Sequence, residues 1–577
     1  MDLAPAGITF DYLREQTVGA DATFETPFGQ RTMVYCDYTA SGRCLTFVEN
    51  YLQQVHRSYA NTHTEDDVTG RSMTHLLQRA EEIIKQSVNA GPDGCIIATG
   101  TGASGAINKL QQILGIACPP ATKRRFDRAV SDALGEAACA QLQTWQQRHA
   151  PVVFVGPYEH HSNEISWRGG YAQVVEVDLT EDGSVDLEHL ERLLRAPEFA
   201  GRFLVGSFSA ASNVTGMRSP VEAIAALLHR YGALACFDYA ACAPYEAIDM
   251  NPRNSGEGDA SIDAIFLSPH KFLGGPGSSG ILVFNRRIYA EDLPPTVAAG
   301  GTVDYVSPEA EDFIADIETR EKAGTPGILQ TIRAALAFEV KDALGTRQIA
   351  AREHALLTRA MERWGADQNI EILGNPDPAR RIGIVSFNVK GSAGRYLHPK
   401  LVTALLNDLF GIQSRAGCSC AGPYGHRLLD IGNERSLQYR HIVAAGYAGL
   451  KPGWCRVGFH FSMDDIEADY VMEAVSFIGR YGERFVHLYD FDLHSGCWMH
   501  RGDKTVPPDL SLAAALRAPP VAKTALPSDV RNRLYRSYLG EAHAQAELFA
   551  DQQACAWQLP QELAALQYFA LDKRAIS

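Results

Sequence analysis

A single lysine, Lys271, stands between a histidine and a run of glycines in LSPHKFLGGPGSSGILV, residues 267–283. An apolar, strand-like run precedes this lysine and another follows it, so Lys271 lies in a turn between two predicted strands. Glycines in such a turn let the backbone approach a ligand closely. Lysines are common on protein surfaces, so a chemical role for this amine requires a partner group elsewhere in the chain.

Asp238 supplies such a partner, because it ends another strand-like run, CFDYA. A carboxylate in an apolar run costs free energy unless it is paired. A lysine and an aspartate on neighbouring strand ends are what a pyridoxal phosphate site requires. The lysine forms a Schiff base with the cofactor, and the aspartate keeps the ring nitrogen protonated. The alternatives are an ordinary exposed lysine and an aspartate that caps a helix.

Three further polar segments follow predicted strands. TGTGASGAINKL, residues 99–110, is a glycine-rich turn that opens a helix, and amides at a helix start suit a phosphate. YEHHSNEISW places His160 and His161 after a strand, and SNVTGM places Asn213 after another. Because ligands bind at the carboxyl ends of parallel strands, we expect these groups to face one region.

The elements that must position these groups alternate between strand and helix from about residue 150. PVVFVGP, QVVEVDL and RFLVGSF are β-rich runs, and VDLEHLERLLR and PVEAIAALLHRYG between them are helical. Such alternation predicts an α/β fold with a mostly parallel sheet covered by helices.

The length of 577 residues predicts two or more domains. We expect an N-terminal segment over 1–30 and a large cofactor-binding domain over 31–326, with a helical insertion at about 119–150. A connector helix and a small C-terminal domain follow over 327–485. A proline-containing linker and a helical extension complete the chain over 486–577.

The composition, 46% hydrophobic and 21% charged, is that of a globular protein. A net charge of −15 argues against nucleic acid or an anionic membrane as a partner. The sequence contains no apolar run of membrane-spanning length and no signal-peptide pattern at its start. Cysteines such as Cys95 and Cys236 stand alone in apolar runs, which is typical of a reducing compartment, so we expect a cytoplasmic protein.

Over residues 31–480 the chain resembles the class V aminotransferase family of fold type I pyridoxal phosphate enzymes, and within it the cysteine desulfurases and selenocysteine lyases. The similar segments, in order, are YCDYTASGR, SYANTH, EHHSN, SNVTG, SPHKFLGGPGSSG, AGTP and RAGCSCAGP. The resemblance implies a large domain with a mostly parallel seven-stranded sheet, a smaller α/β C-terminal domain and a C-terminal extension. It also implies a homodimer that acts on an amino acid.

The resemblance implies a role for each matching residue. Lys271 would hold pyridoxal phosphate and shuttle protons, Asp238 would pair with the ring nitrogen, and His160 would stack on the ring as an acid or base. The other cofactor-binding residues implied are Ala103, Ser104, Asn213, Ser268, His270 and, from the partner subunit, Thr325. The substrate-binding residues implied are Arg456, Arg415, Asn213 and His63. The planar guanidinium group of an arginine can donate two hydrogen bonds to a carboxylate, which suits Arg456 for binding the carboxylate of a substrate.

The reaction that the resemblance implies depends on Cys420. In a cysteine desulfurase this thiolate attacks the sulfur of L-cysteine, leaving alanine and an enzyme persulfide that a protein acceptor can take. A structural thiol is one alternative. A metal half-site with Cys418 is another, but no second cysteine pair follows nearby, so we expect no metal. His494, Cys497 and His500 in HSGCWMHRGD form a weaker metal pattern.

The sequence also departs from the family pattern. Ala241 stands where the family has a glutamine for the ring hydroxyl, Thr64 where it often has an arginine, and Cys418 and Ser419 where this branch has histidines. Lys271, Asp238 and His160 are intact, so these departures leave the cofactor site in place. They keep open β-elimination or transamination of another amino acid. A non-catalytic protein of the same fold is a further alternative, against which the intact Lys271 argues.

Overall fold

The computed structural model describes residues 7–62, 64–253, 258–391, 394–505, 524–552, 559 and 561–571. Its chain divides into two compact units. The large-sheet unit comprises residues 41–213 and 217–349, and the small-sheet unit comprises residues 1–40, 214–216 and 350–577. Within the described part of the chain, no helix is both long enough and apolar enough to cross a membrane.

Seven strands form the sheet of the large-sheet unit, in the order β4-β10-β9-β8-β7-β5-β6. The strands are β4 (Gly94–Ala98), β5 (Val152–Val155), β6 (Gln173–Glu176), β7 (Leu204–Ser209), β8 (Leu234–Asp238), β9 (Ala264–Leu267) and β10 (Ile281–Asn285). Only β10 runs antiparallel to its neighbours, which are β4 and β9. The prediction of a mostly parallel seven-stranded sheet is therefore confirmed.

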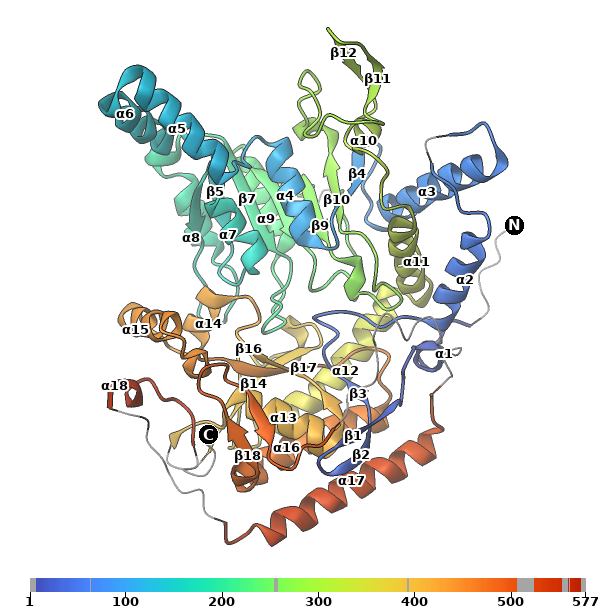
Figure 1. Cartoon of the computed structure of the whole chain (residues 1–577), viewed down its shortest axis with the longest axis vertical. Coiled ribbons are helices and arrows are strands. Elements are labelled where there is room, and N and C mark those ends of the chain that lie inside the picture. The colour runs from blue at the N-terminus through green and yellow to red at the C-terminus, as the bar shows by residue number, and fades with distance from the viewer. Residues whose placement is uncertain are drawn as a thin grey trace. The chain divides into compact units, whose positions relative to one another are not determined.

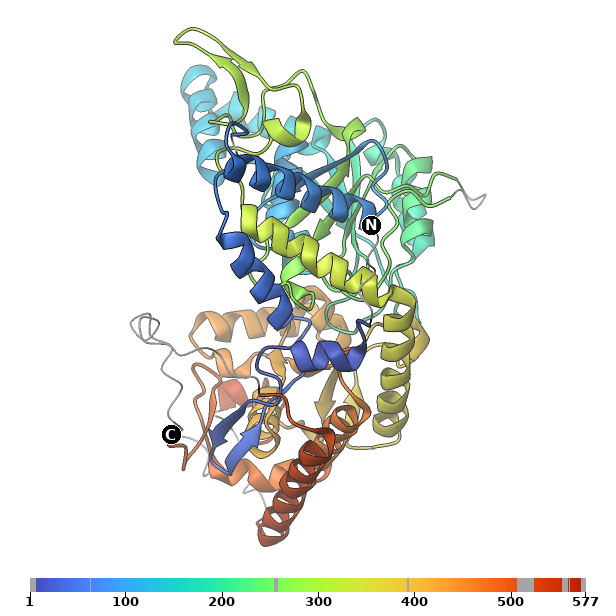
Figure 2. The same ribbon diagram turned by 90° about the vertical axis from the view of Figure 1, so that its right-hand side faces the viewer.

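Helices cover this sheet because its strands are apolar on both faces and must be buried on both. The helices are α2 (Thr46–His56), α3 (Val68–Ser87), α4 (Ala103–Ile113), α7 (Ile165–Arg168), α8 (Leu187–Leu194), α9 (Val221–Arg230), α10 (Ile317–Arg320) and α11 (Ile328–Leu344). Leu110 on α4 packs with Val153 and Phe266 of the sheet in one buried cluster. Helix α11 lies beside α3 (Figure 2).

Two elements of this unit stand apart from the sheet. A helix pair, α5 (Pro120–Leu134) and α6 (Glu136–His149), projects from the unit (Figure 1), and neither helix contains a buried residue. Gly135 joins the two helices with φ of 84°, a left-handed conformation that favours glycine. A short hairpin, β11 (Val303–Val306) with β12 (Glu311–Phe313), is the other element.

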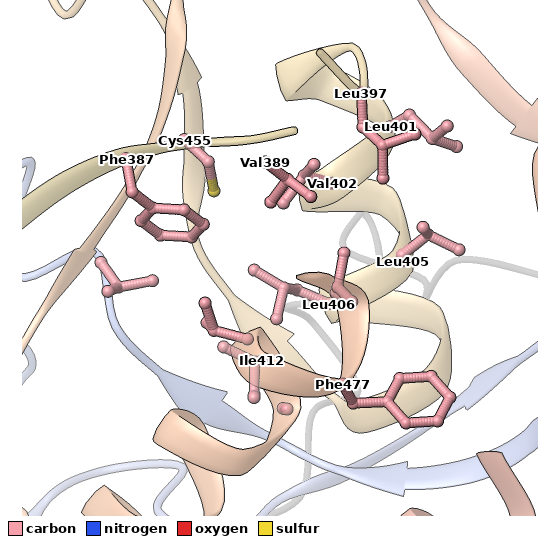
Figure 3. Packing of buried hydrophobic residues seen from close by; sticks show 14 of the residues in the cluster. Phe387, Val389, Leu397, Leu401, Val402, Leu405, Leu406, Ile412, Cys455 and Phe477 are labelled. Atoms are coloured by element: carbon pink, nitrogen blue, oxygen red, sulfur yellow. The ribbon is translucent and has the colours of Figure 1, made fainter. Parts of the chain in front are cut away.

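The small-sheet unit contains an antiparallel sheet of four strands in the order β13-β14-β17-β16. Its strands are β13 (Ile370–Ile372), β14 (Ile384–Val389), β16 (Arg415–Gly417) and β17 (Trp454–Gly458). The helices of this unit include α1 (Phe10–Gln16), α13 (Pro399–Phe410), α14 (Gly422–Leu428), α15 (Asn433–Ala444) and α16 (Asp465–Tyr481), together with residues 350–365 of α12 (Thr346–Gly365). Figure 3 shows Val389 of β14 beside Val402 of α13 in the core, and Phe387, Leu401 and Leu405 belong to the same buried cluster.

A segment from the N-terminal end of the chain completes this unit. Strand β3 (Val34–Tyr35) pairs in parallel with β15 (Ile412–Gln413), and β1 (Thr23–Thr26) forms a hairpin with β2 (Gly29–Thr32). The Cys36 amide donates to the Gln413 carbonyl at 2.9 Å, and the Gly458 amide donates to the Cys36 carbonyl at 2.8 Å. Cys36 is therefore held between β15 and the end of β17.

The C-terminal extension packs against the same unit through α17 (Ser528–Leu548), and a short hairpin, β18 (Tyr489–Phe491) with β19 (Trp498–His500), precedes it. Tyr535 of α17 stacks on Tyr470 of α16, with ring centroids 4.0 Å apart and planes 5° from parallel. Arg531 of α17 forms an ion pair with Asp464. Helix α17 is therefore part of this unit's core.

We expect Tyr535→Ala to destabilise the small-sheet unit by about 3–5 kcal/mol, because it leaves a cavity beside Tyr470 where a large aromatic ring is buried. The matched control is Tyr535→Phe, since the Tyr535 hydroxyl is buried without a hydrogen-bond partner among the described residues. Removing that hydroxyl should leave stability unchanged or raise it. Urea unfolding measures both variants, and an equal loss in both would contradict the packing role of the ring.

Candidate active site

The predicted cofactor residues of the large-sheet unit lie after the carboxyl ends of parallel strands. The positions are Ala103 and Ser104 after β4, His160 after β5, Asn213 after β7, Asp238 at the end of β8, and Ser268, His270 and Lys271 after β9. Strands β9, β8, β7 and β5 are successive neighbours in the sheet and run in one direction. The fold therefore brings these groups to one edge of the sheet.

Lys271 ends a single turn of 3-10 helix, Pro269–Lys271, and is half-buried. The Lys271 amide donates to the Ser268 carbonyl at 2.9 Å, and the Gly42 amide donates to the His270 carbonyl at 2.9 Å. A Cβ atom on Gly42 would lie 2.0 Å from the Phe272 carbonyl oxygen. The segment around Gly42 thus packs directly on the lysine turn and holds it in place.

Asp238 is 4% exposed, and its side chain accepts a hydrogen bond from the Ala240 amide at 2.8 Å. Burial raises the pKa of this carboxyl above its usual range, while the Ala240 amide and the positive charge of Lys271 act to lower it. A buried carboxylate of this kind is stabilised by a cation or a charged donor. The protonated ring nitrogen of pyridoxal phosphate is such a donor, so Asp238 fits that cofactor.

The N-terminus of α4 has the properties of a phosphate site. No side chain caps the helix at Gly102, and the Ala103 amide donates to the Ser268 hydroxyl at 2.8 Å. A Cβ atom on Gly102 would lie 3.1 Å from the Ser268 hydroxyl and 3.4 Å from His270 Nε2. A Cβ atom there would crowd both groups, and with glycine in place the backbone amides and two polar side chains border one space suited to an anion.

Ser162 connects His160 to Ser104 through hydrogen bonds. The Ser162 amide donates to His160 Nδ1 at 3.1 Å, and the hydroxyls of Ser104 and Ser162 are hydrogen-bonded. Because a backbone amide can only donate, Nδ1 is an acceptor and a neutral His160 ring carries its proton on Nε2. Ser162 was not among the residues that the sequence analysis selected, although it stands in the EHHSN segment.

Glu159 is a second residue that sequence reasoning missed. Its carboxylate accepts hydrogen bonds from the Ser209 amide at 2.7 Å, the Ser209 hydroxyl at 2.6 Å and the Asn163 side chain at 2.7 Å. Burial raises the pKa of Glu159 to about 7, although the bonds from Ser209 and Asn163 act to lower it. The contact ties the segment after β5 to the end of β7, next to His160. An acidic residue four positions after the end of an apolar strand was the available signal.

Thr325 and His63 are the remaining predicted residues on this side of the chain. Thr325 is exposed, and its hydroxyl accepts a hydrogen bond from the Asn61 side chain of the same chain at 3.0 Å. A role for Thr325 at a partner subunit's phosphate stays a prediction. His63 lies outside the described residues.

The small-sheet unit holds the two predicted substrate arginines side by side. Arg415 on β16 and Arg456 on β17 are directly paired across the strands. Asp37, which sequence reasoning did not select, binds both: Arg456 Nη2 donates to Asp37 Oδ1 at 2.9 Å, and Arg415 Nε donates to Asp37 Oδ2 at 3.0 Å. Its place in the YCDYTASGR motif was the available signal.

Cys418 and Cys420 lie in the turn between β16 and α14. Cys420 is exposed and Cys418 is half-buried. Ser419 and Cys420 both have left-handed backbones, with φ of 49° and 57°, which is uncommon for residues other than glycine. Among the residues that the structure describes, no three or more histidine, cysteine, aspartate or glutamate side chains gather as metal ligands do.

A family model described as Aminotransferase class-V matches residues 136–471 of the chain. Two curated relatives, from Streptomyces coelicolor and Halalkalibacterium halodurans, are both named probable cysteine desulfurase. The first is 27% identical over 427 residues, which are 73% of this chain and 91% of the relative. The second is 27% identical over 396 residues, which are 68% of this chain and 84% of the relative. The matches confirm the resemblance seen in the motifs.

Two solved structures share the fold. The apo structure of a cysteine desulfurase from Thermococcus onnurineus has a TM-score of 0.59 at 21% identity, covering 78% of this chain and 95% of that chain. The cysteine desulfurase CsdA of Escherichia coli has a TM-score of 0.56 at 20% identity, covering 76% and 93%. These likenesses confirm the predicted fold class.

Burial, and then the charge of Lys271, lower the pKa of His270 from 6.5 to about 4. The unfolded chain therefore binds more protons than the folded chain between these pH values, and stability falls as the pH drops from 6.5 towards 4. We expect His270→Gln to lose less thermal stability than the wild type on going from pH 7 to pH 5. The control is the exposed His75→Gln. Equal losses in wild type and His270→Gln would contradict a neutral, half-buried imidazole.

Proposed function

The chain belongs to the class V aminotransferase family, whose members use pyridoxal phosphate, and from this premise we propose that it converts L-cysteine to L-alanine and leaves the sulfur on Cys420 as a persulfide. The observation that carries the proposal is the buried Asp238 carboxylate at a strand end, within the electrostatic influence of Lys271 at the next strand end. The names of the two curated relatives support the choice of reaction.

In this proposal the residues around the sheet edge hold the cofactor. The amides at the start of α4 and the Ser268 hydroxyl bind the phosphate, and Asp238 keeps the ring nitrogen protonated. When bound, pyridoxal phosphate withdraws electrons from the substrate's α-carbon. Lys271 Nζ is the group that anchors the cofactor and then takes the proton from that carbon. His160, whose Nδ1 accepts from the Ser162 amide so that the neutral ring carries its proton on Nε2, would lie against the cofactor and hold or return a proton.

Arg456 and Cys420 act on the substrate itself. Arg456 binds the α-carboxylate through its planar donor fork, a role that suits its buried position on β17. The Cys420 thiolate attacks the substrate sulfur, so that a sulfur–sulfur bond forms as the bond from sulfur to Cβ breaks. The electron pair of the broken bond remains with the carbon fragment, where a proton takes the place of sulfur and alanine results. The exposure of Cys420 lets a protein acceptor reach the persulfide.

The proposal also covers the oligomeric state of the protein and its location in the cell. We propose a cytoplasmic homodimer in which Thr325 of each chain serves the partner subunit's phosphate site. Thr325 is exposed in the single chain, so its hydroxyl is accessible to a second subunit.

We expect Lys271→Ala to abolish the visible absorbance of the protein–cofactor linkage and to lower turnover at least about a thousandfold, since no other group takes both of its roles. Absorbance spectra and alanine formation measure the two effects. The control is Lys322→Ala, because that lysine pairs with Glu81 and is not among the candidate site residues. Retention of the visible band in Lys271→Ala would show that the cofactor is held elsewhere.

We expect Cys420→Ala to keep the visible absorbance and to lose sulfur release from L-cysteine by at least about a hundredfold, because the nucleophile is absent. Mass spectrometry of the trapped persulfide and quantification of alanine are the measurements. The control is Cys497→Ala, since Cys497 is also exposed. Pyruvate and sulfide formed at the wild-type rate in Cys420→Ala would instead assign β-elimination, and no turnover of any amino acid would favour a non-catalytic protein.

A further inference from the structure

We propose that Glu159 is a positioning residue for the cofactor, because its buried negative charge beside Asp238 strengthens the binding of a protonated ring nitrogen by Asp238. The ligand that Glu159 favours is then a phosphorylated aromatic aldehyde whose ring carries a positive charge, over a neutral ring of the same shape. The inference takes from the proposed function only the pairing of Asp238 with the ring nitrogen, and it does not depend on which reaction follows.

Hydrogen-bond donors surround the Glu159 side chain, which is buried with 3% exposure. Oε1 accepts from the Gly156 amide at 3.2 Å and from the Ser209 amide at 2.7 Å. Oε2 accepts from the Asn163 side chain at 2.7 Å and from the Ser209 hydroxyl at 2.6 Å. Backbone and side-chain amides can only donate, so three of these four bonds need lone pairs on Glu159, which a carboxylate supplies on both oxygens.

The residues around Glu159 hold its carboxylate in one place. A Cβ atom on Gly156 would lie 2.5 Å from Glu159 Oε1, so a side chain at position 156 would displace the carboxylate. Asn163 is held in turn, because its Oδ1 accepts from the Ser207 hydroxyl at 2.6 Å and from Trp167 Nε1 at 3.1 Å. The negative charge therefore has a fixed position at the end of β7.

That position is next to Asp238. Ser209, which donates two of the four hydrogen bonds, lies directly opposite Asp238 on the neighbouring strand β8. Adjacent strands are about 5 Å apart, so the two buried carboxylates are close enough to interact. Burial raises the pKa of Glu159 to about 7, and the negative charge of Asp238 adds to that effect. Above pH 7 Glu159 is therefore ionised and repels the Asp238 carboxylate.

A positive charge beside Asp238 relieves this repulsion. Asp238 is 4% exposed, so water screens the charges at this edge of the sheet only weakly. A ring nitrogen that carries a proton next to Asp238 is attracted by both carboxylates, and Glu159 therefore raises the proton affinity of that nitrogen. A ring with a C–H group at the same place gains nothing from either charge.

The test uses the full-length protein freed of cofactor and compares the binding of pyridoxal phosphate with that of its deaza analogue, in which a C–H group replaces the ring nitrogen. Both ligands carry the same phosphate and aldehyde, so the contributions of α4 and Lys271 cancel in the ratio of their Kd values. At pH 8 we expect the wild type to favour pyridoxal phosphate, and Glu159→Gln to reduce that preference about tenfold. Titration of the ligand absorbance measures both Kd values.

The matched control is Ser209→Ala, which removes one hydrogen bond to Glu159 and leaves its charge in place. This variant should weaken the binding of both ligands alike and keep the ratio within about twofold of the wild type. A merely structural role of Glu159 would give the same result in Glu159→Gln, with both ligands weakened and the ratio unchanged. That outcome would overturn the proposal.

Glu159→Gln places a donor opposite the side-chain amide of Asn163. If the variant fails to fold for that reason, Glu159→Gln combined with Asn163→Asp restores the match of donor and acceptor. The combined variant moves the charge from the residue bound to Ser209 to the residue bound to Ser207, farther from the end of β7. The ratio should then also fall below that of the wild type, and a wild-type ratio would count against the role of Glu159.

Asp238→Asn separates this inference from the proposed function. The preference for pyridoxal phosphate should be lost in Asp238→Asn, and adding Glu159→Gln should then change the ratio by less than about twofold, since no charged nitrogen remains for Glu159 to act on. If Asp238→Asn keeps the wild-type preference, the placement of the ring nitrogen in the proposed function is wrong. If Asp238→Asn loses the preference and Glu159→Gln keeps it, only the role of Glu159 is wrong.

Discussion

The candidate site depends on one costly arrangement, the burial of the Asp238 carboxylate at the carboxyl end of β8. A buried carboxylate is unstable without a positive or strongly donating neighbour. The sheet provides one by placing the lysine turn at the end of the adjacent parallel strand β9. The charge of Lys271 acts on Asp238 in the chain alone, and a protonated ring nitrogen takes over that role in the proposed enzyme. The remaining groups of the site are arranged around this pair.

Close packing and buried hydrogen bonds hold the loops that carry those groups. Gly42 packs against the turn after Lys271 at a distance that excludes any side chain. Glu159 connects the end of β5 to the end of β7 with hydrogen bonds, inside the sheet edge where water does not compete. Loops held in this way keep donors and acceptors in place before a ligand arrives, which is how binding sites limit the entropy lost on binding.

In the small-sheet unit, ion pairs hold the candidate site residues in place. Its arginine pair is stable because Asp37, an acidic residue from the N-terminal end of the chain, binds both arginines on two neighbouring strands from the C-terminal half. The extension after residue 524 contributes to the same unit, since Tyr535 and Arg531 of α17 pack on α16 and its N-cap residue Asp464. Both ends of the chain therefore build one core, and the sites on it depend on segments remote in sequence.

The sequence by itself determined the α/β class, the mostly parallel sheet and the presence of polar groups after several strands. These features follow from local rules, because alternating apolar runs specify strands and helices, and parallel strands place their following loops at one edge. The motifs in their order along the chain also indicated the family. Only the tertiary structure decided which side chains meet. Asp37 binds partners 378 and 419 positions away, and Glu159 binds Ser209 at a separation of 50 positions. No local pattern encodes such contacts, since a hydrogen bond or ion pair depends on distances that arise only when separate strands pack together.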